Sequence, residues 1–232
     1  TEAAVASGRR SDGMATMTGV RSHIGGGLAE GRMDNPAKPK CFTVEMLGQL
    51  AAHLETIDHE QSVRAVMLTA EGDRAFCTGA DINGWGDLTP AEFARHWVRD
   101  GHRIFDRLAR LSKPTIAVLA GHAFGGGLEL AAACDLRVIA PGASLALPEA
   151  GVGIVPGWSG TQRLLRLLPE AVVKEMALFG HRIKADRALA LGFVAAVADD
   201  PRAAAETLLG RAVTLSPRAV EIGKSMIHAA AG

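Results

Sequence analysis

The sequence predicts an α/β fold in which buried strands alternate with amphipathic helices. Two short, continuous apolar runs, at residues 65–69 and 115–119, are typical of strands that are buried on both faces. Apolar residues recur at helical spacing between and after these runs, and no low-complexity linker interrupts the chain after residue 40. The 232 residues therefore predict a single large domain at residues 20–232, of which residues 182–232 form a helical C-terminal part.

The first 19 residues are expected to form a disordered arm or the remnant of a tag. Arg9 and Arg10 are not followed by the apolar stretch of a secretory signal. Short strands are expected at residues 20–24 and 28–33, within a glycine-rich region of weak pattern.

Helix signals are clearest in two places. Ordered structure is expected from Thr43, and the residues that follow it predict a helix through their apolar spacing: Leu47, Leu50, Ala51, Leu54 and Ile57. Thr89-Pro90-Ala91-Glu92 combines a capping box with proline at the first helical position, so a long helix is expected to begin there. The apolar face of that long helix comprises Phe93, Trp97, Val98, Ile104, Phe105, Leu108 and Leu111, and Lys113-Pro114 ends it.

The rest of the chain continues the alternation. We expect strands at residues 136–140, 144–147 and 193–198, and helices at residues 125–134, 161–168, 170–179 and 185–191, with further helices closing the chain.

Composition excludes several classes of function. Twenty-five basic residues balance 25 acidic ones, so the zero net charge disfavours nucleic acid as a partner. No apolar run approaches the roughly 18 residues that span a bilayer. Cys41, Cys77 and Cys134 are odd in number and far apart, which predicts free thiols, a reducing cytoplasmic setting and no metal site.

Residues 75–82 form the first segment that could carry chemistry. They follow a predicted buried strand and a turn, and loops at strand ends commonly bind ligands in α/β proteins. A plain connection is an equally good interpretation of this segment taken alone.

The second segment is GHAFGGGLEL at residues 121–130. Three consecutive glycines lead from a predicted strand into an apolar helix, whose first N–H groups have no helical partner and lie at the positive end of the helix dipole. Such amides can stabilise an oxyanion, with Glu129 one turn into the helix. The competing interpretation is a glycine turn packed against the sheet, with Glu129 solvated. The spacing GxxxGGG does not match the dinucleotide fingerprint GxGxxG.

The third segment begins with Pro148-Glu149. Glu149 follows a predicted apolar strand, where a carboxyl group can be tuned as an acid or a base, although a lone turn glutamate is more often solvated. A serine hydrolase elbow nearly appears at Gly157-Trp158-Ser159-Gly160, but its final glycine would fall on Thr161.

Three blocks in this order and spacing resemble the crotonase (enoyl-CoA hydratase/isomerase) family. They are GADI at 79–82, GGGLEL at 125–130 with Cys134-Asp135 behind it, and Pro148-Glu149 with Pro156-Gly157 and GTQRL at 160–164. The resemblance extends from about residue 42 to the C-terminus. It departs from the family at Trp158 and Ser159, where small residues are usual.

The resemblance implies a spiral of ββα units with C-terminal helices, assembled as a homotrimer or a dimer of trimers. It implies an acyl-CoA thioester whose carbonyl oxygen binds the amides of Ala80 and Gly126. Glu129 and Glu149 match the two catalytic glutamates. The implied substrate-binding residues are Ala80, Asp81, Ile82, Asn83, Gly126 and Gly157.

Hydration of a 2-enoyl-CoA to a 3-hydroxyacyl-CoA is the leading hypothesis, because relatives with both glutamates are typically hydratases. It needs no cofactor, since coenzyme A is part of the substrate. Two alternatives remain: a double-bond isomerase that uses one glutamate, and a non-catalytic binding protein of the same fold. The sequence does not decide which glutamate is acid and which is base.

Overall fold

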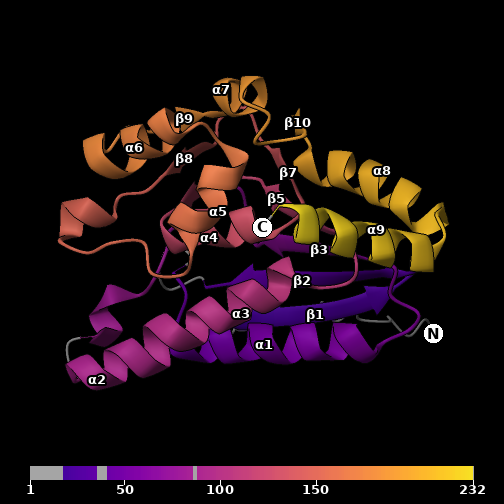
Figure 1. Ribbon diagram of the computed structural model, residues 1–232, viewed down its shortest axis with the longest axis horizontal. Coiled ribbons are helices and arrows are strands. Elements are labelled where there is room, and N and C mark those ends of the chain that lie inside the picture. Colours follow the sequence, from indigo (N-terminus) through magenta and orange to yellow (C-terminus); the bar gives the residue numbers. More distant parts are fainter. Residues whose placement is uncertain (1–17, 36–40, 86–87, 232) are drawn as a thin grey trace, which may run out of the picture.

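The computed structural model describes residues 18–35, 41–85 and 88–231, apart from the side chain of Asn83. Two sheets lie at its centre, with helices on both sides (Figure 1). The larger sheet has the strand order β1-β2-β3-β5-β7-β10. Its strands are β1 (Gly19–Gly25), β2 (Leu28–Asp34), β3 (Ala65–Ala70), β5 (Thr115–Leu119), β7 (Leu136–Ile139) and β10 (Ala196–Val197).

Only β1 runs antiparallel in the larger sheet. It pairs with β2 through a turn in which Gly26 and Gly27 have φ of +59° and +81°, a conformation that favours glycine. β1 begins at Gly19, the last residue of the expected arm, and residues 1–17 lie outside the described residues. The strands expected at 20–24 and 28–33 are confirmed.

The smaller sheet has the order β4-β6-β8-β9. It comprises β4 (Ala75–Cys77), β6 (His122–Phe124), β8 (Ser144–Ala146) and β9 (Ile183–Lys184). The first three are parallel and β9 is antiparallel to β8. The pattern did not reveal β4, β6 or β9 as strands because each is too short to show a two-residue period.

The chain alternates between the two sheets. β3 is followed by β4, β5 by β6 and β7 by β8, and each pair leads into helix, which is the repeating ββα unit that the resemblance implies. The helical segments are α1 (Val44–His59), η1 (Ile82–Trp85), α2 (Pro90–Glu92), η2 (Phe93–Arg99), α3 (Asp100–Ala109), α4 (Gly126–Ala133), η3 (Glu149–Val152), α5 (Gly160–Leu167), α6 (Glu170–Phe179), α7 (Ala185–Ala190), α8 (Pro201–Thr214) and α9 (Pro217–Ala230).

The central strands are buried on both faces because helices cover both. Alternate residues of β3 and β5 face opposite ways. Ala65, Met67, Ile116 and Val118 pack with Leu209 of α8, whereas the residues between them belong to the main core with α1 and α3. Both apolar runs in the sequence therefore mark central strands, as predicted.

The predicted helix starts are confirmed. The Thr43 side chain accepts from the Met46 amide at 3.1 Å, and Thr89 and Glu92 form the complete capping box. The helix that begins at Pro90 is not regular α-helix throughout, because residues 93–99 are π-helical. In that segment the carbonyl of Trp97 also accepts a hydrogen bond from the Trp158 indole, and such insertions into the helical ladder accompany π-bulges.

None of the three cysteines, all of which lie within the described residues, forms a disulfide, as predicted. Cys77 and Cys134 are buried, and burial raises the pKa of Cys134 to about 12, so this thiol stays protonated. None of the helices within the described ranges is long and apolar enough to cross a membrane.

Candidate active site

Three segments predicted to carry chemistry meet at one edge of the smaller sheet. β4, β6 and β8 are parallel neighbours, so their carboxyl ends lie together. Ala80 follows β4, Gly126 follows β6 and Glu149 follows β8. A β-carbon built on Gly79 would lie 3.5 Å from the Gly126 nitrogen, which shows how closely the first two segments approach.

A backbone bridge fixes the direction of the Ala80 amide. The Phe42 amide donates to the Gly79 carbonyl at 2.8 Å, and the Asp81 amide donates to the Phe42 carbonyl at 2.9 Å. In a parallel bridge of this kind, the residue between the two bonded partners directs its own N–H and C=O away from the bridge. Within the described residues, neither the Ala80 nor the Gly126 amide donates to another group of the chain.

Each glycine of the GGG run has its own structural reason. Gly125 has φ +52°, and a β-carbon there would lie 3.0 Å from Glu149 Oε1. A β-carbon on Gly126 would lie 2.5 Å from Cζ3 of Trp158, and one on Gly127 would lie 2.1 Å from the Cys77 carbonyl oxygen. The run therefore packs tightly against its neighbours and also leads into the first turn of α4, while the Gly125 amide donates to the Ala146 carbonyl at 3.0 Å.

Glu129 is buried and firmly held, not solvated. It is 2 % exposed, and its Oε1 accepts from the amides of Trp158 at 2.8 Å and Gly160 at 2.7 Å. Burial raises the pKa of Glu129, and these amide donors together with the charge of Arg163 oppose that rise. The carboxylate therefore has preformed donors for its ionised state.

Glu149 is also buried, at 8 % exposure, but it has a different environment. Its Oε2 has no hydrogen-bond partner within the described part of the chain. Burial, with a smaller contribution from the charge of Glu129, raises the pKa of Glu149 to about 7. The two acids are thus close enough to interact, and their surroundings separate their proton affinities.

The Trp158 indole packs behind the glycine helix start. It is 3 % exposed, and its ring approaches both Gly126 and Gly101, where a β-carbon would lie 2.2 Å from Nε1. Nε1 donates to the Trp97 carbonyl at 3.0 Å. The residue that replaces a usual small residue is therefore part of the wall of the site.

Ser159 has a left-handed backbone, with φ +69°, and is the one residue other than glycine with a positive φ in the described ranges. Such a conformation costs about 1–2 kcal/mol for an L-residue. It places the flanking amides of Trp158 and Gly160 on one carboxylate oxygen, and its own Oγ is hydrogen-bonded to His102 Nδ1 on α3.

The remaining predicted substrate-binding residues lie around this edge. Asp81 and Ile82 follow Ala80, with Ile82 about half exposed at 49 %, and Asn83 lies in η1. Gly157 precedes the loop that holds Glu129, and its amide contributes to lowering the pKa of that acid. All the predicted site residues therefore belong to one region of the fold.

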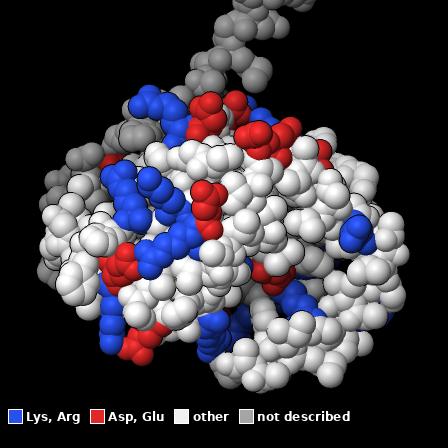
Figure 2. Space-filling view, turned by 90° about the horizontal axis from the view of Figure 1, so that it is seen from above, with Lys and Arg blue, Asp and Glu red and all other residues white. Residues whose placement is uncertain are grey.

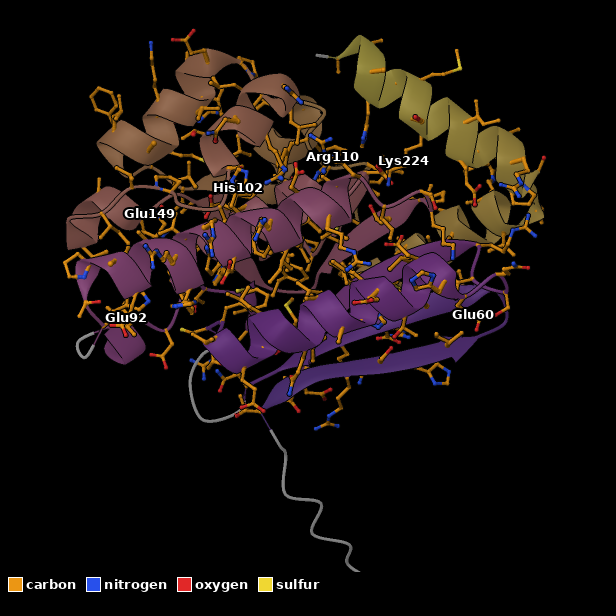
Figure 3. The ribbon with its side chains drawn as sticks, turned by 60° about the horizontal axis from the view of Figure 1, so that its bottom comes forward. Glu60, Glu92, His102, Arg110, Glu149 and Lys224 are labelled. Carbon is orange, nitrogen blue, oxygen red and sulfur yellow. The ribbon has the colours of Figure 1, made fainter. Side chains whose placement is uncertain are left out.

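Sequence reasoning missed the residues that hold Glu129. Trp158 and Gly160 act through backbone amides, which no side-chain pattern reveals. His102 lies on α3, 57 residues from Ser159 (Figure 3). The signal that was available is the pair of glycines at 157 and 160, which mark a turn around Trp158 and Ser159.

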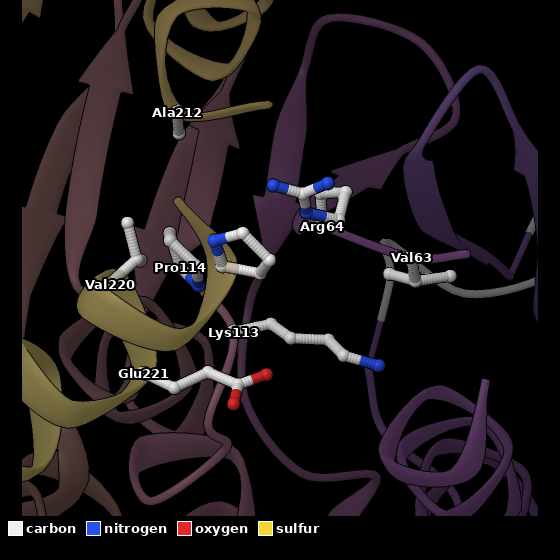
Figure 4. Close-up of a pocket in the computed structure, with 8 residues that line it drawn as sticks. Val63, Arg64, Lys113, Pro114, Ala212, Val220 and Glu221 are labelled. Carbon is white, nitrogen blue, oxygen red and sulfur yellow. The ribbon is translucent and has the colours of Figure 1, made fainter. Parts of the chain in front are cut away.

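A small cavity lies away from the candidate active site and contains none of its residues. Its volume is about 10 Å³, which is room for about one water molecule. It is lined by Val63, Arg64, Lys113, Pro114, Ala212, Pro217, Val220 and Glu221 (Figure 4).

The charged side chains on the face shown in Figure 2 do not form a field of one sign, because basic and acidic residues are interspersed there.

The fold is that of an α/β enzyme, with two buried carboxylic acids beside neighbouring parallel strands: Glu129 lies in α4, which follows β6, and Glu149 follows β8.

The chain belongs to the enoyl-CoA hydratase/isomerase family, whose model matches residues 23–231. It is 33% identical to a short-chain-enoyl-CoA hydratase of Clostridium acetobutylicum over 205 residues, covering 88% of this chain and 78% of the relative. It is 39% identical to a probable mitochondrial enoyl-CoA hydratase of Arabidopsis thaliana over 168 residues, 72% of this chain but only 56% of that protein. A solved enoyl-CoA hydratase from Bacillus anthracis superposes with a TM-score of 0.85 at 31% identity, covering 90% of this chain and 82% of the other.

Proposed function

We propose that the protein adds water to a 2-enoyl-CoA and forms a 3-hydroxyacyl-CoA. The observation that carries this proposal is the pair of buried acids in unequal environments. Glu129 has two amide donors on one oxygen, whereas Glu149 has a buried oxygen without a partner and a pKa of about 7. When the environments of two carboxyl groups give them different pKa values, one group can accept a proton while the other donates one.

The unequal environments also support a division of roles. Glu129 serves as the base, because its amide donors favour the carboxylate. Glu149 serves as the acid, because burial keeps it protonated to a higher pH. Water lies between them: Glu129 takes its proton as the oxygen bonds to the β-carbon, and Glu149 delivers a proton to the α-carbon.

The amides of Ala80 and Gly126 bind the thioester oxygen in this proposal. Electron density moves from the attacking water through the double bond to this oxygen, so an enolate-like charge develops there. Two N–H donors, one at a helix N-terminus, stabilise that charge more than the neutral ground state. The absence of an internal acceptor for either amide within the described ranges supports this role.

The rest of the substrate is assigned to the segment around η1. Asp81, Ile82 and Asn83 contact the coenzyme A portion, while Gly157 lies beside the acyl portion. Hydration balances with water as the only added reactant, so no separate cofactor is assigned. The supporting observation is that this segment adjoins Ala80, whose amide holds the reacting end.

Assembly as a homotrimer or a dimer of trimers is also proposed. The surface of α9 supports it, because no side chain of that helix is buried and Ile222, Met226 and Ile227 are 59–70 % exposed. Apolar side chains gathered on one helix are typical of an interface.

The direct test is incubation with crotonyl-CoA. We expect the absorbance of the conjugated enoyl thioester to fall and 3-hydroxybutyryl-CoA to appear. A folded protein that shifts the double bond of a 3-enoyl-CoA but never adds water to crotonyl-CoA would support an isomerase instead.

A further inference from the structure

The loop that follows Gly157 is tied to the helix that runs from Phe93 to Ala109. The Trp158 indole donates to the Trp97 carbonyl, and Ser159 Oγ is hydrogen-bonded to His102 Nδ1. Further along, Arg163 Nη2 lies 3.5 Å from Asp106 Oδ1. Three successive side-chain contacts therefore join this loop and the start of α5 to one side of the helix.

Ser159 is the middle contact and differs from the other two. Its backbone is left-handed, and the amides on either side of it both donate to Glu129 Oε1. Adjacent N–H groups converge on one anion when the residue between them is in this conformation. The orientation of Glu129 therefore depends on the backbone of Ser159.

A backbone requirement alone does not explain a serine here. Glycine adopts this conformation at lower cost, so the reason for a serine must lie in the interaction that its Oγ makes. Ser159 is buried, at 7 % exposure, and its Oγ is hydrogen-bonded to His102 Nδ1. The hydroxyl fixes a conformation that the backbone by itself disfavours.

We infer that His102 is a positioning residue, which acts through Ser159 to hold Glu129 in the orientation that hydration requires. This inference rests on the proposed function of Glu129. Within the described residues, the side-chain hydrogen bonds of His102 go to Ser159 Oγ and not to either acid, so we expect it to change the rate through the loop. Loosening the loop weakens two of the donors that oppose the effect of burial, so the pKa of the Glu129 carboxyl group rises further.

The kinetic test uses Ser159→Ala, Ser159→Gly and His102→Ala with crotonyl-CoA. Each should lower kcat by roughly 10- to 100-fold with little change in KM, as small misplacements of a reacting group do. The double variant Ser159→Ala/His102→Ala should be no slower than the singles, because both remove one contact. His102→Gln can keep a hydrogen bond to Ser159 and should retain more activity than His102→Ala. His96→Ala is the matched control, since His96 is 62% exposed at its side chain and pairs with Asp100.

The pH profile separates positioning from general damage. Amide donors stabilise ionised Glu129, so losing them raises its pKa and moves the acidic limb of the kcat profile to higher pH. Arg163 and Glu149 also influence Glu129, and neither is altered in these variants. Wild-type kcat and pH profile in Ser159→Gly, or multiplicative losses in the double variant, would overturn the inference.

A second measurement does not depend on turnover. Carbon-13 NMR of the labelled Glu129 carboxyl group should show a higher pKa in His102→Ala than in the wild type, with His96→Ala unchanged. Equal values in all three proteins would reject the role of His102. If the folded wild-type protein is inactive on crotonyl-CoA, the proposed hydration is rejected. The titration of Glu129 then still tests whether His102 positions Glu129 through the loop.

Discussion

A β-carbon on Gly160 would lie 2.4 Å from Cγ of Glu129 and 2.7 Å from its Oε1. The same glycine donates its amide to that oxygen at 2.7 Å. Gly160 thus supplies a hydrogen bond and leaves the space in which the carboxylate lies, so the first turn of α5 shapes the environment of an acid that belongs to α4.

Gly160→Ala should therefore displace Glu129. We expect a loss of stability of about 1–3 kcal/mol from overpacking, and a loss of kcat on crotonyl-CoA of roughly 10²-fold. Urea unfolding and steady-state kinetics measure the two effects. Gly48→Ala is the control, because Gly48 is an exposed position of α1 and, apart from its chain neighbours and the backbone of its own helix, no atom of the described residues lies within 4 Å of a β-carbon there. A Gly160→Ala protein with normal turnover would contradict the assigned position of Glu129.

Glu129→Gln and Glu149→Gln should each abolish most of the hydration. Removing a general acid or base typically costs about 10²–10⁴-fold in rate, and the two losses should not add because both groups act on one transition state. The rate of crotonyl-CoA loss gives the answer. Intact hydration in Glu129→Gln, with none in Glu149→Gln, would disprove the paired mechanism.

The rate of hydration should fall as the pH rises through about 7 in the free enzyme. Glu149 must be protonated to act as the acid, and its pKa is about 7. The dependence of kcat/KM on pH reports this group. A basic limb of the profile that stays unchanged in Glu149→Gln would show that another group causes it.

The same pKa predicts how the free energy of unfolding depends on pH. The folded value of about 7 exceeds the usual 4.5, so the native state binds more protons between these values and loses stability as the pH rises through that window. Glu149→Gln resembles the protonated acid and should avoid this loss. We therefore expect the free energy of unfolding of Glu149→Gln, relative to that of the wild type, to be more favourable at about pH 8 than at about pH 5, as measured by urea unfolding.

Comparison of Gly126→Ala with Gly126→Pro isolates the amide at the helix start. Both variants bring a β-carbon toward Trp158, whose ring would be 2.5 Å away, but only proline removes the N–H. We expect proline to lower kcat by a further factor of roughly 10²–10³ relative to alanine, as the loss of one oxyanion donor does. Equal rates in two folded variants would remove Gly126 from the oxyanion site.

Light scattering should show a trimer or a hexamer at micromolar concentration. Met226→Glu and Ile227→Glu place charges on the exposed apolar side chains of α9 and should weaken the assembly, whereas His228→Glu, on the same helix, should not do so to the same extent. A monomeric wild-type protein would reject the proposed oligomer.

Much of the fold could be predicted because it depends on local patterns. The runs that became β3 and β5, the Thr43 cap and the Thr89–Glu92 capping box each carry their signal within a few residues. β4 and β6 were missed as strands for the opposite reason. They are three residues long, and their pairing partners are distant in the sequence.

The π-helical geometry of residues 93–99 could not be predicted from the sequence pattern either. Its apolar residues recur as in an ordinary helix, and the departure becomes visible only where the Trp158 indole reaches the Trp97 carbonyl from 61 residues away.

The sequence by itself determined the α/β class, the order of the three chemistry-bearing segments and the identity of the two glutamates, because composition, periodicity and motif spacing are properties of the chain. Only the tertiary structure decided how the acids differ. Glu129 receives two amides across a turn that Ser159 fixes, and Glu149 keeps a buried oxygen without a partner within the described residues. The proton affinity of a carboxyl group depends on its desolvation and on hydrogen-bond donors from other strands and loops. Because Glu129 and Glu149 are the same residue type, the difference between them comes from the packing around each.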